Sequence, residues 1–236
     1  MSLSKTIFSL ISGTKLSKPT QPSFEIEIQQ YLQRSQKEYG RIIQSCLRKS
    51  IITLSLKPWY ASYLKDMMLL QKKLNTAMHL SIQNPHHYHS LKYEYEKYLR
   101  HSGFHDITRK DLQSLFPDPK NYVKVHGSSA AQALCAYVES IVEHKPMALT
   151  GVIIMAEACT NEFSSQSRII LFLTGLSSAT NFISIHNTSD HAPYYSDLFQ
   201  TAKKLSASPE EKKEIYEALE ICASQLSLAL IQNCKM

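Results

Sequence analysis

Two side chains that can bind a metal ion, His186 and Asp190, stand four residues apart in the stretch 183–195. On a helix, residues separated by four positions lie on one face, so this imidazole and this carboxylate would point the same way. Together they suit a hard or borderline metal ion. Ordinary surface pairs and capped turns have the same spacing, so the pair alone leaves both interpretations open.

His191 and Pro193 follow this pair directly. On a regular helix His191 points about 100° away from Asp190, so it joins the pair as a ligand only if the helix is distorted. Proline removes a backbone hydrogen bond and bends a helix, which makes such a distortion reasonable here.

Glu157 is a carboxylate inside the apolar segment 147–161. Burying a carboxylate costs several kcal/mol unless it is paired, protonated or bound to a metal. A functional carboxylate is one explanation. A neutral or hydrogen-bonded core glutamate, or one at the edge of its helix, is the other.

His101 and His105 form a second pair four residues apart. With Glu94 and Tyr98 they make a stripe along one helical face, and Glu94 and His101, two turns apart, would reach the same ion. Ser102 and Gly103 weaken a helix at this point. An amphipathic face with exposed polar groups explains the stripe as well as a metal site does.

Hydrophobic periodicity predicts the elements that must position these residues. Proline and Asn-Pro pairs separate the apolar stripes, and Ser208-Pro209 followed by two glutamates is a strong helix start. No alternating strand and no internal repeat is visible. We expect one all-α domain over 24–236, preceded by a flexible arm over 1–23. It has about seven helices, over 24–49, 58–79, 86–101 (continuing toward 115), 128–143, 147–161, 167–186 (continuing onward with a kink at Pro193) and 209–232.

Composition narrows the class of protein further. The 236 residues carry a mild net charge of +6, and no run of five basic residues occurs, which argues against a nucleic-acid partner. No apolar run approaches the length that spans a bilayer, so we expect no membrane partner. Five widely spaced cysteines without a C-x-x-C motif suit reduced thiols in the cytoplasm. A homodimer is compatible with these features.

Three stretches resemble segments of the heme-oxygenase-like helical proteins, which include heme oxygenases, TenA and PqqC relatives and diiron oxidases. Residues 54–66 resemble the entry of the family's second helix. Residues 101–115 resemble the His-Asp…Asp-Leu segment of the iron-binding branch, and residues 143–157 resemble the central helix that ends in a functional glutamate. The resemblance spans about residues 24–232 and implies a heme-oxygenase-like helical bundle.

The resemblance implies a ligand set for one or two iron ions. In the diiron branch, a glutamate and a histidine come from one helix, a glutamate from the central helix, and a His-x3-Asp-x2-His motif from a later helix. The positions that match are His105, Glu157, His186 and Asp190, with Glu94, His101 or His191 completing the set. Pro193 stands where the final histidine of the motif belongs, which puts the second iron in doubt.

The expected function is therefore a non-heme iron oxidase or oxygenase that uses O₂ on a small organic substrate in a helical pocket. Heme binding or heme oxygenase activity is an alternative, but it requires a different axial ligand, because the family's histidine lies on the first helix and this chain has none before His79. A second alternative is a non-catalytic binding protein that kept the fold and lost the site.

Overall fold

The computed structural model describes residues 23–101, 104–116, 118, 121, 127–186, 192–206 and 208–235, and for residues 101, 104, 105, 186 and 192–196 it describes the backbone alone. The predicted arm over 1–23 lies outside these residues except for Ser23. Within them the secondary structure is helical and contains no strand, which confirms the all-α prediction. The helices are α1 (Phe24–Ile52), α2 (Leu56–Gln83), α3 (His89–His101), α4 (Phe104–Leu115), α6 (Ser129–Ile141), α7 (Pro146–Leu173), α8 (Asn181–His186), α9 (Ala192–Leu205) and α10 (Pro209–Asn233), with a 3₁₀ turn at Ser177–Ala179.

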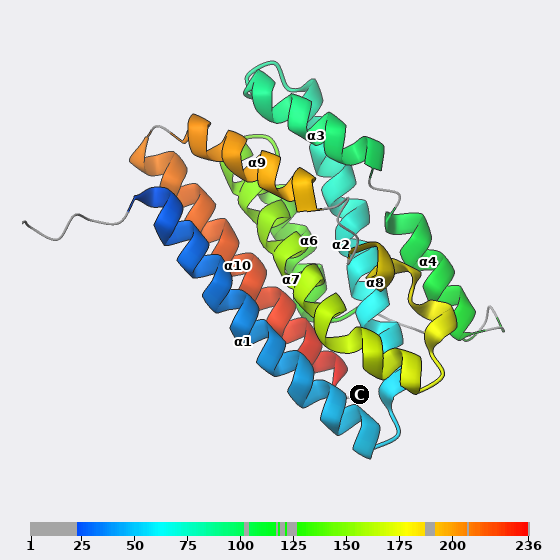
Figure 1. Cartoon of the computed structure of the whole chain (residues 1–236). Coiled ribbons are helices and arrows are strands. Elements are labelled where there is room, and N and C mark those ends of the chain that lie inside the picture. The colour runs from blue at the N-terminus through cyan, green and yellow to red at the C-terminus, as the bar shows by residue number, and fades with distance from the viewer. Residues whose placement is uncertain are drawn as a thin grey trace, which may run out of the picture.

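The helix α7 is the centre of the bundle. It packs against α1, α6, α8, α9 and α10, and its most extensive interface is with α10 (Figure 1). Gln36 of α1 donates a hydrogen bond to the carbonyl of Ala158, and Gln44 donates to Gln166 two turns later, so α1 and α7 run in the same direction. Nearly every residue of α7 between Met147 and Cys159 is buried, which fits its position in the middle of the fold.

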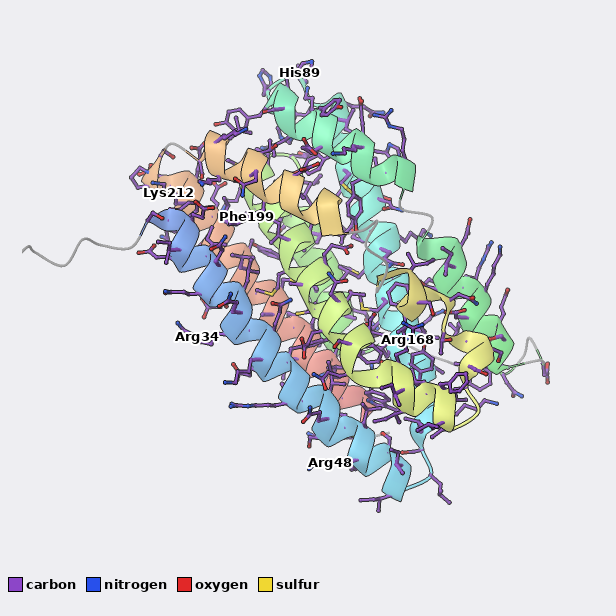
Figure 2. The ribbon with its side chains drawn as sticks, viewed as in Figure 1. Arg34, Arg48, His89, Arg168, Phe199 and Lys212 are labelled. Atoms are coloured by element: carbon purple, nitrogen blue, oxygen red, sulfur yellow. The ribbon has the colours of Figure 1, made fainter. Side chains whose placement is uncertain are left out.

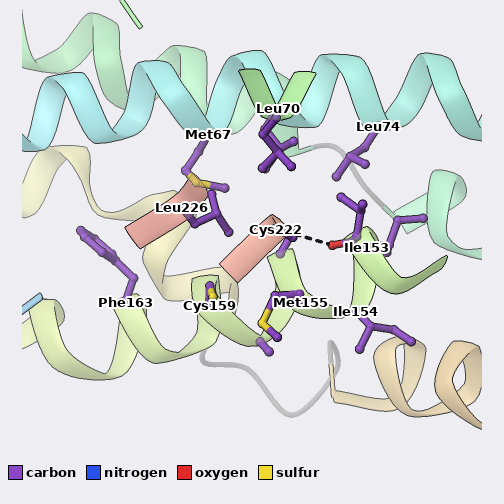
Figure 3. Packing of buried hydrophobic residues seen from close by; sticks show 14 of the residues in the cluster. Met67, Leu70, Leu74, Ile153, Ile154, Met155, Cys159, Phe163, Cys222 and Leu226 are labelled. Atoms are coloured by element: carbon purple, nitrogen blue, oxygen red, sulfur yellow. Dashed lines mark hydrogen bonds between the residues drawn. The ribbon is translucent and has the colours of Figure 1, made fainter. Parts of the chain in front are cut away.

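The core is built where α2, α7 and α10 meet. Figure 3 shows Met67, Leu70 and Leu74 of α2 above Ile153 and Phe163 of α7, with side chains of α10 between them. The thiol of Cys222 donates to the carbonyl of Val152, at an Sγ–O distance of 3.6 Å. Gly151 allows close approach at this contact, because a Cβ added there would lie 2.9 Å from the carbonyl oxygen of Ile215.

Buried polar groups fix the ends of several helices. Asp66 of α2 accepts hydrogen bonds from the backbone amide of Ser128, at 2.6 Å, and from the side chain of Asn233, at 2.8 Å, so it ties α2 to α6 and α10. Asp111 of α4 accepts from the side chain of Asn181 and the backbone amide of Phe182, each at 2.7 Å. That second carboxylate holds the start of α8 and thereby positions the helix that ends at His186.

Several predicted helix boundaries are confirmed and others differ. The last helix starts as predicted, with a complete capping box between Ser208 and Glu211 and proline at its first position. The helix predicted over 86–101 and toward 115 is two helices, α3 and α4, so His101 and His105 do not share one helix. The predicted break between 161 and 167 does not occur, because α7 continues to Leu173. The helix predicted from 167 through 186 and onward is wrong, since α8 is a short separate helix and α9 starts at Ala192, with Pro193 in its first turn.

No helix in the described part of the chain combines the length and apolar composition needed to cross a membrane.

Candidate functional site

Glu157 lies where α3 meets the central helix. Its side chain is largely buried, and the hydroxyl of Tyr98 on α3 donates a short hydrogen bond to its carboxyl group. Burial raises the pKa of this carboxyl to about 7, and the hydrogen bond from Tyr98 opposes only part of that rise. Near neutral pH, protonated and ionised Glu157 are therefore both populated.

The environment of Tyr98 keeps its hydroxyl protonated. Burial, and then the charge of Glu157, raise the pKa of its phenol well above the usual value, so the hydroxyl keeps its proton and remains a hydrogen-bond donor. Among the described residues no basic side chain pairs with Glu157. The negative charge of such a buried carboxylate is neutralised either by a proton or by a bound cation.

Glu94 occupies the same face of α3, one turn before Tyr98. Its side chain is only 13% exposed, and one oxygen lies 4.0 Å from the Nζ atom of Lys97. Lys97 in turn forms an ion pair with Asp197 of α9. These charges hold α3 against α9 and place a second carboxylate on the side of α3 that carries Tyr98.

The remaining predicted ligands are placed only through their backbones or lie outside the described residues. His101 is the last residue of α3, His105 is the second residue of α4, and His186 is the last residue of α8. Asp190 and His191 lie outside the described residues. Among the residues that are described, no group of three or more His, Cys, Asp or Glu side chains is arranged to hold a metal ion.

Polar atoms that the sequence did not single out are buried around the same part of α7. Trp59 Nε1 and the Tyr63 hydroxyl on α2, and Asn161 Oδ1 and Ser164 Oγ on α7, have no hydrogen-bond partner within the described residues. Burial raises the pKa of the Tyr63 phenol well above its usual value, and Glu157 and Thr160 are close enough to influence it. Such groups are costly in an interior unless a ligand or water meets them.

An aromatic stack supports these polar atoms from the α2 side. The ring of Tyr63 is parallel to that of Phe163, with centroids 3.5 Å apart, and Trp59 lies 5.7 Å from the same ring. Tyr60 anchors the stack because its hydroxyl donates to the carbonyl of Ala179 at 2.7 Å. The helical stripe of α2 predicts that Trp59 and Tyr63 are buried, but their meeting with α7 is a tertiary contact that periodicity does not reveal.

Comparison with solved structures identifies the fold. The chain is similar to a domain of unknown function with a heme oxygenase-like fold from Shewanella denitrificans OS217, with a TM-score of 0.75, 15% identity, and coverage of 89% of this chain and 91% of that one. It is also similar to a TenA homolog from Pseudomonas syringae pv. tomato DC3000, with a TM-score of 0.66, 12% identity, and coverage of 91% and 94%.

No model of a protein family matches the sequence, and no curated protein does either. The two similar solved structures show that the chain has a heme-oxygenase-like all-α fold, as its short sequence motifs predict.

Proposed function

We propose that this protein is a non-heme iron oxidase or oxygenase that acts with O₂ on a small organic substrate. The observation that carries the proposal is Glu157: a buried carboxyl on the central helix that no described basic residue neutralises. Its position on α7 is the one that the resemblance to the diiron oxidases assigns to an iron ligand.

The chemistry of the donor set fits iron. Glu157 and Glu94 supply carboxylates from α7 and α3, and His101 and His186 are the last residues of α3 and α8. Carboxylate and imidazole ligands suit non-heme Fe(II) centres that activate O₂. An iron ion held by these residues would supply the redox chemistry that no amino-acid side chain provides.

The residues around that position have definite tasks. Tyr98 donates to one carboxyl oxygen of Glu157 and so fixes the orientation of the carboxyl group. Hydrogen bonds of this kind around ligating carboxylates orient them and tune the site. The stack of Trp59, Tyr63 and Phe163 keeps bulk water away from this side of α7.

The first test is the iron content of protein purified from iron-supplemented cells. We expect Glu157→Gln and His186→Ala each to lower iron per chain about tenfold or more, because removing a ligand costs more affinity than the 10- to 100-fold typical of supporting residues. Tyr98→Phe is expected to lower it less, since that change removes only the supporting hydrogen bond.

His144→Ala is the matched control, because that imidazole is 80% exposed in the loop before α7. It should leave the iron content unchanged. Wild-type protein with less than about 0.2 iron per chain, a level that His186→Ala does not lower further, would overturn the proposal.

A further inference from the structure

A cavity of about 650 Å³ lies between the C-terminal half of α7 and the segment that leads into α8. Its lining includes three types of side chain: hydroxyls, one guanidinium and apolar groups. Among them are Ser165, Ser184, Arg168, Ile169 and Phe172. No acidic side chain contributes to this described lining, so the cavity is positively charged.

Hydroxyl groups line the polar side of the cavity. Ser165 of α7 and Ser184 of α8 both contribute side chains to its wall. Ser164 lies behind this wall, because it is 0% exposed. The hydroxyl groups that reach the cavity favour a ligand with acceptor oxygens.

Arg168 stands one turn beyond Ser164 on the same face of α7, on the side toward α8 (Figure 2). No carboxylate in the described part of the chain forms an ion pair with it. A guanidinium next to hydroxyl donors is a typical site for a carboxylate or phosphate group, because it offers paired hydrogen bonds to two anionic oxygens.

Apolar side chains adjoin this polar end. Ile169 and Phe172 line the cavity and remain 70% and 68% exposed, which is unusual for such large apolar residues. Covering them would remove apolar surface from water, so a ligand with an apolar body gains affinity here.

We propose that this cavity binds a small organic anion, with its acidic head group at Arg168 and Ser184 and its apolar body against Ile169 and Phe172. Arg168 lies eleven residues after Glu157 on one helical face, which is roughly 16 Å along the helix axis at about 1.5 Å per residue. The cavity is thus a separate site, and the inference does not depend on iron at Glu157.

The proposal is tested by titrating the purified protein with phenylacetate, phenyl phosphate, inorganic phosphate and the neutral alcohol 2-phenylethanol. Isothermal calorimetry measures the affinities. Trp59, the single tryptophan, packs on Phe163 beside Ser164 and gives a fluorescence signal for the same event. We expect one or both aromatic anions to bind at least about tenfold more tightly than the alcohol and than inorganic phosphate, since a charge-assisted bidentate pair adds roughly that factor.

Substitutions of residues that line the cavity test whether the anion binds there. Arg168→Gln should weaken binding of the anion about tenfold and Ser184→Ala should weaken it less, whereas Arg48→Gln, at an exposed position of α1, should have no effect. Equal binding of the alcohol and the anions, or unchanged affinity in Arg168→Gln, would overturn the proposal. Because iron content is measured separately, loss of the iron site and loss of this site are distinguishable.

Discussion

Replacing Gly151 with leucine is expected to lower the free energy of unfolding by about 3 kcal/mol or more, the upper range for overpacking. Even a single Cβ atom at this position would lie 2.9 Å from the backbone oxygen of Ile215 and 3.0 Å from the Cβ atom of Ala218. The first of these is backbone, which cannot rotate away, so α7 and α10 must separate along their longest contact.

Thermal unfolding measures this effect, and a loss of that size corresponds to roughly 6–12 °C in Tm for a chain of this length. Ser45→Leu is the control, because it adds the same side chain at an exposed position of α1. A Gly151→Leu protein as stable as wild type would show that α7 and α10 are not packed as closely as described.

Replacing Glu157 with glutamine is expected to stabilise the iron-free protein at alkaline pH. Burial raises the pKa of this carboxyl from 4.5 to about 7, so between these values the folded protein holds a proton that the unfolded chain has lost. Stability must then fall as pH rises through this window, by about 3 kcal/mol in total. Glutamine does not ionise and avoids this loss.

Urea unfolding of chelator-treated protein at pH 4.5 and pH 8 measures the difference. The two proteins should be similarly stable at pH 4.5, and the variant should be more stable at pH 8. Glu38→Gln removes one charge at an exposed position of α1 and corrects for net charge. Parallel stability profiles for wild type and Glu157→Gln would show that the carboxyl ionises as freely in the folded protein as in the unfolded chain.

The same substitution should have the opposite sign when iron is bound. A ligand that binds only the folded state adds stability according to its affinity, and Glu157→Gln removes that contribution. The reversal separates a metal ligand from a carboxyl that is merely buried.

Local sequence signals predicted much of the fold. Ser208 and Pro209 start the last helix as predicted, and Ser208 and Glu211 form a capping box there. The end of α7 was not predictable in this way. Polar residues after Asn161 suggest a loop, but side chains such as Ser167 bond to the carbonyl one turn back while α1 packs alongside. Tertiary packing thus overrides local propensity there.

The site was predictable to a smaller extent. An acidic residue in an apolar helix identified Glu157, and helical spacing placed Tyr98 and Glu94 on one face of α3. The contact of Tyr63 with α7 could not be predicted, because it joins helices about a hundred residues apart in the sequence. Arg168 lies eleven residues after Glu157 and therefore on the same face of α7. This relation could not be predicted, because it requires α7 to be continuous through both residues.

The most direct test of the account is a crystal structure of protein from iron-supplemented cells, with anomalous scattering measured at the iron absorption edge. We predict an anomalous peak about 2 Å from a carboxyl oxygen of Glu157, the usual distance for a metal–carboxylate bond. An iron-free map in which Glu157 is met only by the hydroxyl of Tyr98 would contradict it.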